Sequence, residues 1–265
     1  MQNRLIISVD SLEIGYGKGN KAVSLLPPIK ATGHEGELIA VLGRNGIGKS
    51  TFLGTIAGIT TKLGGNIYIN KREIGEYSQN ELARTVGYVS TETVKVNNMT
   101  VLDLVSLGRF PYTNWYGKIE PDDHEAIMDA LDKTGLAAFS GRALNEISDG
   151  ERQKAMIARV LAQDAGIMVM DEPTAFLDIG SRYEFVHLLH TLAAERSKII
   201  LLATHDLHTA VANADKIWLM LDEGLSEGTP LGLFENGSFE RLFDDSRISS
   251  VMKTSILDWL RYSLS

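Results

Sequence analysis

The segment GRNGIGKST, residues 43–51, constrains the fold of this chain more than any other feature. It follows the apolar run ELIAVLG, which has the length and composition of a buried strand, and it precedes TFLGTIAGI, which has a helical pattern. A glycine-rich loop between a strand and a helix matches the pattern G-x-x-x-x-G-K-[ST] in the context that this pattern requires. We therefore expect a phosphate-binding loop here.

Each part of this loop has an expected role in holding a nucleotide. The glycines let backbone N–H groups close around phosphate oxygens, and the following helix points its positive end at the same anion. Lys49 is expected to reach the β- and γ-phosphates, and Ser50 to bind Mg²⁺. The loop residues expected to contact the nucleotide are Gly43, Arg44, Asn45, Gly46, Ile47, Gly48, Lys49, Ser50 and Thr51.

Polar residues follow two later strands of the predicted sheet. Asp171 and Glu172 end the run IMVMDE, and His205 lies in ATHD, directly after another apolar strand. Carboxyl ends of parallel strands meet at one edge of a sheet, where ligands bind. We expect Asp171 to hold Mg²⁺ through water, Glu172 to polarise the attacking water as general base, and His205 to contact the γ-phosphate.

The order of the predicted elements indicates an α/β fold. The first third reads as strands, residues 95–163 read as helices, and strands then alternate with helices, which is typical of a parallel sheet covered on both faces. Thr100 and Asp103 predict a helix start, Gly108 a helix end and Pro121 a second start. The expected strands span residues 4–16, 37–43, 66–70, 86–90, 166–171, 198–204 and 216–221, and the later helices span residues 180–195 and 206–213.

Composition narrows the classes of partner. The formal net charge of −8 argues against nucleic acid, because phosphate backbones are bound by basic patches. The absence of cysteine excludes disulfides and thiolate metal sites and fits a reducing compartment. No apolar run approaches the roughly 20 residues of a membrane span. We expect a cytoplasmic chain that acts at a membrane only through a partner.

The stretch ISDGERQK, residues 147–154, combines a helix start with an unexplained glycine. Ser148 and Glu151 have the spacing of a capping box, in which each side chain bonds the other residue's backbone. Gly150 then falls in the first helical turn, where glycine costs about 1 kcal/mol relative to alanine. The sequence thus raises the hypothesis that this loop faces a ligand.

Taken together, these motifs resemble those of the ATP-binding subunits of ABC transporters, and the resemblance runs to about residue 230. GRNGIGKST resembles Walker A, IMVMDE resembles Walker B, and ISDGERQ resembles the family signature LSGGQ. TAFLD, which ends in Asp178, is similar to the D-loop, and ATHD to the switch-histidine segment. Tyr16 matches the aromatic residue that stacks on adenine in this family.

The resemblance implies a P-loop NTPase fold of the RecA-like type: a parallel-sheet core, an N-terminal antiparallel β portion and an inserted α-helical subdomain. It implies one ABC ATPase domain over residues 1–265. Its parts would be a core (1–94 and 164–230), the helical subdomain (95–163) and a C-terminal helical tail (231–265), which packs on its own domain or forms a dimer contact.

The resemblance also implies function and partners. ATP and Mg²⁺ would be the cofactors, and ATP hydrolysis would drive transport. Two copies would form a head-to-tail homodimer in which each ATP lies between one phosphate loop and Ser148, Gly150 and Asp178 of the other copy. The further partners would be a polytopic membrane permease and, indirectly, a periplasmic or lipoprotein substrate-binding protein. The chain would then be peripheral on the inner face of the membrane.

Two longer stretches, TVLDLVSLGRFPYTNWYG and RALNEISDGERQKAMIARVLAQ, resemble subunits of iron–siderophore, haem and cobalamin importers. The alternative is a soluble ABC ATPase without a membrane partner, such as an iron–sulfur cluster assembly type. The transported compound is not encoded in this chain. The first of these stretches contains an aromatic group that consists of Phe110, Tyr112, Trp115 and Tyr116. We expect this group either to contact the permease or to form a small local core.

Two residues depart from the family pattern. Thr91, followed by Glu92, stands where the family has a glutamine that touches Mg²⁺, so Thr91 would bind the metal through water or Glu92 would replace it. Asp149 stands where the family more often has glycine. A carboxylate near a γ-phosphate would repel it, so the Asp149 side chain is expected to point away.

Overall fold

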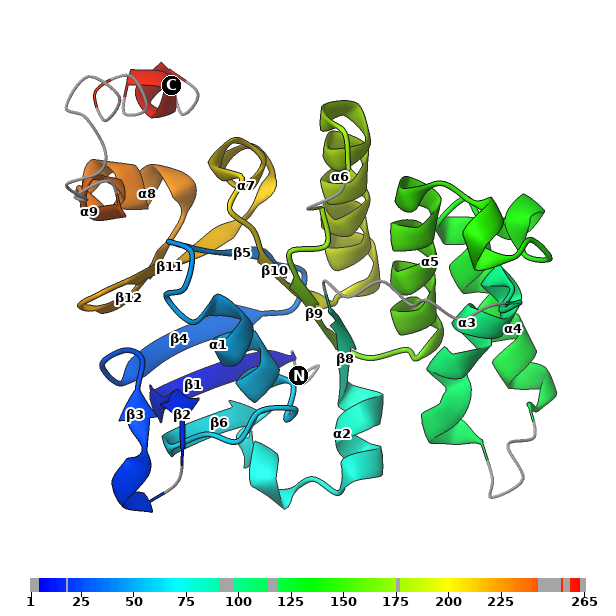
Figure 1. The fold of residues 1–265 in the computed structure, drawn as a ribbon, viewed down its shortest axis with the longest axis horizontal. Helices are drawn as coiled ribbons and strands as arrows, with labels where there is room; N and C mark the ends of the chain where they lie inside the picture. Colours follow the sequence, from blue (N-terminus) through cyan, green and yellow to red (C-terminus); the bar gives the residue numbers. More distant parts are fainter. Residues whose placement is uncertain are drawn as a thin grey trace.

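A computed structural model describes residues 5–17, 19–90, 98–113, 119–174, 177–242, 254 and 258–262 (Figure 1). Two sheets, with helix α1 packed between them, make one half of the molecule, and a group of helices makes the other. Phe52, Leu53 and Ile56 of α1 belong to a buried cluster with residues of both sheets. No helix within these ranges is long and apolar enough to cross a membrane.

The larger sheet has the order β12-β11-β5-β10-β9-β8. All neighbouring pairs are parallel except β11 and β12. The inner strands β9 and β10 are buried at every residue, which explains their continuous apolar sequences. Its strands are β5 (Leu38–Gly43), β8 (Val86–Val89), β9 (Ile167–Asp171), β10 (Ile199–Ala203), β11 (Lys216–Leu221) and β12 (Gly224–Gly228).

The smaller sheet is antiparallel, with the order β4-β1-β6-β7, as the sequence predicted for the N-terminal portion. Buried and accessible residues alternate along β4, so one face packs on the core. Its strands are β1 (Ile6–Glu13), β4 (Ile29–His34), β6 (Gly64–Ile69) and β7 (Arg72–Glu73), and a separate hairpin pairs β2 (Gly15–Tyr16) with β3 (Val23–Ser24).

Two helices start where the sequence predicted, whereas α2 was not predicted and α8 and α9 were predicted only as parts of a helical tail. Thr100 and Asp103 form a capping box at α3, and Pro121 is the first residue of α4. The α-helices are α1 (Lys49–Ile56), α2 (Gln79–Thr85), α3 (Val101–Ser106), α4 (Pro121–Lys133), α5 (Asp149–Ala162), α6 (Ile179–Arg196), α7 (Leu207–Asn213), α8 (Pro230–Glu235) and α9 (Ser238–Leu242). The 3-10 turns are η1 (Gly19–Lys21), η2 (Ile74–Glu76), η3 (Leu107–Tyr112), η4 (Ala137–Phe139) and η5 (Leu144–Glu146).

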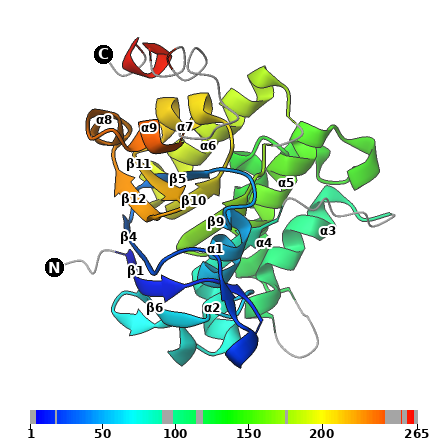
Figure 2. The same ribbon diagram turned by 60° about the vertical axis from the view of Figure 1, so that its left-hand side comes forward.

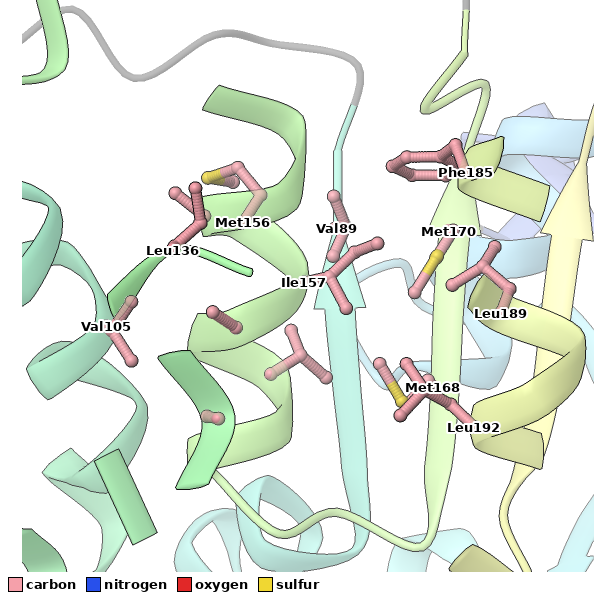
Figure 3. Packing of buried hydrophobic residues seen from close by; sticks show 14 of the residues in the cluster. Val89, Val105, Leu136, Met156, Ile157, Met168, Met170, Phe185, Leu189 and Leu192 are labelled. Carbon is pink, nitrogen blue, oxygen red and sulfur yellow. The ribbon is translucent and has the colours of Figure 1, made fainter. Parts of the chain in front are cut away.

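One buried cluster joins the helical half to the sheet. Ile157 of α5 lies toward Val89 of β8, while Met170 of β9 lies between that pair and Phe185 of α6 (Figure 3). All four side chains are at most 1% exposed. Because α5 is the helix that begins at ISDGERQK, this packing fixes the orientation of that loop relative to the sheet. Figure 2 shows the same helical group from the side.

Gly108 does not end a helix, so the sequence-based expectation for this residue was wrong. The chain continues from α3 directly into η3, and Gly108 lies inside that turn. A Cβ at position 108 would lie 2.1 Å from the backbone oxygen of Arg159 on α5. The glycine is therefore there because two backbone segments approach closely, which no local pattern indicates.

Gly108→Ala is predicted to lower the free energy of unfolding by about 1–3 kcal/mol, the usual cost of overpacking, because a backbone carbonyl moves less readily than a side chain. Gly141→Ala is the matched control, since no atom lies within 4 Å of a Cβ there. Urea unfolding of both variants measures the difference. Equal stability of the two variants would contradict the packing argument.

Candidate nucleotide-binding site

The register of the parallel sheet brings three loops to one edge. Ala203 pairs with Val41 of β5 on one side and with Asp171 of β9 on the other. The phosphate loop follows β5, Glu172 follows β9, and His205 follows β10. The three segments that the sequence assigned to one site are therefore neighbours, as the parallel sheet requires.

The phosphate loop adopts the backbone that its glycines permit. Gly46 and Gly48 have φ angles of 83° and 109°, which side chains rarely adopt. Gly48 immediately precedes α1, whose first-turn N–H groups have no carbonyl partner within the helix. A Cβ at Gly46 would meet no atom of the described residues within 4 Å, so the backbone angle is what favours glycine there. The start of α1 thus presents N–H donors suited to an anion.

Lys49 is folded into this loop. Its Nζ donates to the backbone oxygens of Gly43, at 2.9 Å, and Arg44, at 3.3 Å, and its side chain is 6% exposed. Burial lowers the pKa of Lys49, and the nearby carboxylates of Glu172 and Asp171 oppose that shift. The Nζ to Glu172 Oε1 distance is 4.0 Å. The ammonium group therefore lies between the loop and the acidic strand end, where phosphate oxygens would complete its contacts.

Asp171 is buried, and one of its carboxylate oxygens lacks a hydrogen-bond partner among the described residues. Its Oδ1 has no hydrogen-bond partner among the described residues, although the residue is only 5% exposed. Burial raises the pKa of Asp171, while the Ser50 hydroxyl, which bonds this carboxylate, lowers it. A buried orphan carboxylate oxygen beside a serine hydroxyl is a hard oxygen donor set of the kind that Mg²⁺ prefers. The two residues that the sequence assigned to the metal therefore fit one.

Glu172 links Lys49 to His205. Its Oε2 lies 3.5 Å from Nδ1 of His205, and its Oε1 faces Lys49. The Glu172 φ angle of 47° is unusual for a side-chain-bearing residue, yet its N–H still bonds the Ala203 oxygen of the adjacent strand. Backbone strain of this kind gathers at functional sites. The turn after β9 thus aims a carboxylate across the sheet edge.

The His205 segment is held by groups that sequence reasoning missed. The Asp206 carboxylate caps α7 by accepting from Thr209, and it also accepts from Arg182 of α6 at 2.9 Å. Burial pushes the pKa of Asp206 upward, but the Arg182 and Thr209 hydrogen bonds outweigh it, and the net shift is downward. Arg182 also donates to the Leu177 oxygen, next to Asp178. The signal for Asp206 was its place just before a helix.

Tyr16 lies beside the same helix start. Its hydroxyl is 3.1 Å from Oγ1 of Thr51, and the residue is 62% exposed. The ring is therefore anchored at one end and accessible along its length. A cavity of about 230 Å³ lies on another side of the phosphate loop, lined by Leu42, Gly43, Arg44, Asn45, Thr204, His205, Leu207 and Leu242.

The ISDGERQK loop has the predicted capping box. Ser148 Oγ accepts from the Glu151 N–H at 3.2 Å, and the Ser148 N–H donates to the Glu151 carboxylate at 2.7 Å. Among the described residues, a Cβ at Gly150 would meet only Leu177, at 3.8 Å. Packing against these residues would therefore accept alanine at position 150.

Arg152, which sequence reasoning did not identify, holds this loop through hydrogen bonds. Its guanidinium donates to the backbone oxygens of Leu144, at 3.1 Å, and Ile147, at 3.2 Å, and to Asp149 Oδ1 at 2.7 Å. The Asp149 side chain thus faces an arginine, and its charge is neutralised locally.

Other predicted residues have local roles. Asp178 caps α6 by accepting from Ser181, and Arg44 lies 3.4 Å from the Asp222 carboxylate. Tyr112 is half-buried, with its hydroxyl donating to the Gln163 oxygen, whereas Phe110 is 73% exposed. Of the two described members of the aromatic group, Tyr112 packs locally and Phe110 lies at the surface. Thr91, Glu92, Trp115 and Tyr116 lie outside the described residues.

A phosphate loop after one strand of a parallel sheet, with a buried carboxylate at the end of another strand of that sheet, is typical of P-loop nucleoside triphosphatases. The family model described as "ABC transporter" matches residues 26–175, more than half of the chain. The chain therefore belongs to the ABC transporter family of ATP-binding proteins, and it is an ATPase of the class that energises transport.

Two relatives match along most of their lengths. The chain is 32% identical over 236 residues to the ferric enterobactin transport ATP-binding protein FepC of Escherichia coli, covering 88% of this chain and 85% of that protein. It is 30% identical over 260 residues to the iron(3+)-hydroxamate import ATP-binding protein FhuC of Bacillus subtilis, covering 97% and 96%.

Solved structures support the same fold. A chain of what is described as an inward-facing metal-chelate type ABC transporter has a TM-score of 0.77 at 28% identity and covers 90% of this chain and 89% of that one. A dimeric ATP-binding cassette bound to ADP and Pi has a TM-score of 0.71 at 25% identity and covers 84% and 98%. The predicted fold class is thereby confirmed, and with it the coarser prediction that the domain binds a nucleotide.

Asp149→Gly is predicted to leave the ATPase rate unchanged or to raise it, because the carboxylate faces Arg152 rather than the open side of the loop. Arg152→Gln is predicted to lower the rate about tenfold, since three contacts that shape the loop are lost together. Steady-state ATPase assays compare the two variants. A collapse of activity in Asp149→Gly would contradict this placement.

Asp171→Asn is predicted to raise the free energy of unfolding of the nucleotide-free protein by about 1 kcal/mol. The pKa of Asp171 is raised above its ordinary 3.8, so the folded state loses stability as pH rises through that pKa, and the cost persists at neutral pH. Thermal unfolding at pH 7 measures the gain. Glu184→Gln, at a side chain 76% exposed, is the control and should change little, and a destabilised Asp171→Asn would contradict the account.

Proposed function

We propose that the chain is the ATP-hydrolysing subunit of an ABC importer for an iron–siderophore compound. The observation that carries this proposal is the similarity to FhuC over 97% of the chain, which includes the helical half and the tail as well as the nucleotide site. The soluble iron–sulfur assembly alternative is not favoured, because the named relatives are transport proteins. Haem and cobalamin remain candidate substrates from the sequence resemblance alone.

The residues around the phosphate loop have complementary roles in hydrolysis. Lys49 exchanges its bonds to the Gly43 and Arg44 oxygens for contacts to the β- and γ-phosphates. Glu172 accepts a hydrogen bond from the attacking water and polarises it, and His205, at 3.5 Å from Glu172, contacts the γ-phosphate. Tyr16 stacks on adenine.

Ser50 and Asp171 would hold Mg²⁺, with Asp171 acting through a bound water. The metal supplies charge neutralisation at the β- and γ-phosphates. The orphan Asp171 Oδ1 supports this assignment. Thr91 is proposed as a further contact on the strength of its position after β8 in the sequence.

Ser148, Gly150 and Asp178 would complete the ATP site of a second copy of this chain. Ser148 and Gly150 lie at the N-terminal end of α5, which favours an anion. The open space around a Cβ at Gly150 supports the approach of an external ligand. Closure of two copies on ATP and their opening after hydrolysis would drive the permease.

The remaining partners are membrane-bound or external. A polytopic permease would contact the helical half, where Phe110 is exposed, and a periplasmic or lipoprotein substrate-binding protein would deliver the compound to it. The chain would lie in the cytoplasm on the inner face of the membrane. The same proposal includes the division of the domain into a core, a helical subdomain and a C-terminal tail, with boundaries after residues 94, 163 and 230.

A transport assay tests this proposal. A strain that lacks this gene should lose uptake of radioactive iron presented as ferric siderophore, and the wild-type gene should restore it while a Lys49→Ala copy does not. Affinity purification of the tagged protein in mild detergent should recover a polytopic membrane protein. Normal uptake without the gene, or purification of the chain alone, would favour the soluble ATPase.

Glu172→Gln is predicted to slow hydrolysis at least about 100-fold, the usual contribution of a general base, while ATP still binds. Because hydrolysis no longer reopens the pair, the variant should elute as a dimer in gel filtration with ATP and as a monomer without it. Glu184→Gln should behave as wild type in both assays. Wild-type hydrolysis by Glu172→Gln would remove Glu172 from the mechanism.

A further inference from the structure

The C-terminal turn at residues 258–262 packs against α7, the helix that follows His205. Leu260 is fully buried in a cluster with Ala210 and Val211 of α7, and Trp259 packs against the same cluster. The ring of Trp259 lies 3.5 Å, centroid to centroid, from the ring of His208, at an interplanar angle of 42°. The tail therefore reaches the second residue of α7.

The burial pattern marks this contact as specific. Leu260 is 0% exposed, whereas the neighbouring Asp258 and Tyr262 are exposed, Tyr262 at 84%. The same cluster includes Ala40 and Leu42 of β5, the strand that leads into the phosphate loop. Figure 2 shows the red C-terminal turn above α7 and α9. Residues 258–262 therefore pack behind the nucleotide site. For these residues this favours packing on their own domain over a dimer contact.

Helix α7 needs such outside contacts to fix its start. It has 7 residues, and isolated helices of that length are not stable in water. Arg182 holds its cap through Asp206, and the Trp259 ring holds its first turn through His208. The His205 side chain is 55% exposed, and within the described part of the chain its polar contact is the one to Glu172, at 3.5 Å. The position of His205 therefore depends on where α7 begins.

We propose that Trp259 is a positioning residue for His205: through His208 it holds the first turn of α7 and so sets the approach of His205 to the γ-phosphate. This inference rests on the proposed role of His205 in ATP hydrolysis. Tyr16 and the phosphate loop, which hold the nucleotide in the proposed function, are not part of α7. Loss of the ring contact should therefore slow hydrolysis and leave nucleotide binding unchanged.

The experiment compares full-length variants in steady-state ATPase assays and in binding of a fluorescent ATP analogue. Trp259→Ala should lower kcat about tenfold, as small misplacements of catalytic groups do, with KM and analogue affinity within about twofold of wild type. Trp259→Phe keeps a ring and should restore most of kcat. His208→Ala removes the contact from the other side and should reproduce the kcat loss. Asp258→Ala, at the exposed neighbour, is the control and should match wild type.

The outcomes separate the inference from the proposed function. Unchanged kcat in both Trp259→Ala and His208→Ala would overturn the positioning role and leave the ATPase assignment intact. A parallel loss of kcat and analogue binding would also overturn it, because general damage to the fold would then explain the effect. Full activity of His205→Ala would instead refute the proposed role of His205, and the positioning role would fall with it.

Discussion

Buried opposite charges at the carboxyl edge of the parallel sheet are the constraint on which the rest of the site depends. Burial lowers the pKa of Lys49 and raises that of Asp171, so each charge costs free energy where it lies. The two groups are held there by buried apolar strands and by a loop whose glycines allow the chain to fold back. Phosphate oxygens beside Lys49 and a divalent cation beside Asp171 would offset this cost. Binding of the nucleotide with its metal is therefore expected to stabilise the folded site.

Three loops around the site end in a residue whose side chain caps the following helix. Ser148, Asp178 and Asp206 each cap a helix with their side chains, at α5, α6 and α7. A cap fixes the point at which a helix begins, and the residues before it can then face a ligand without being part of regular structure. Two arginines strengthen these three starts: Arg152 donates to the loop before α5, and Arg182 joins the starts of α6 and α7.

Local patterns were enough to predict much of this arrangement. The strands, the capping boxes and the phosphate loop depend on short runs of residues, and the sheet edge follows from parallel topology. Arg152 and Arg182 escaped prediction because their partners are chosen by three-dimensional packing. Packing of the C-terminal residues on their own domain was one of two predictions, but the partner of Trp259, His208, was not foreseen. Gly108 was misread for the same reason: its neighbour is a carbonyl on another helix. Gly150 differs from Gly108, because the described residues leave space around a Cβ at position 150. The sequence alone indicated that this glycine is unusual, since glycine in a first helical turn is less stable than alanine.

The central claim is that one chain supplies only half of each ATP site. The natural absence of cysteine permits a direct measurement. One chain carrying Asn45→Cys in the phosphate loop is mixed with another carrying Ser148→Cys in the ISDGERQK loop, both with Glu172→Gln to prevent hydrolysis. The account predicts that oxidation with ATP and Mg²⁺ joins the two different chains and that omission of ATP abolishes the product. Cross-linking that ignores ATP, or none with ATP bound, would contradict it.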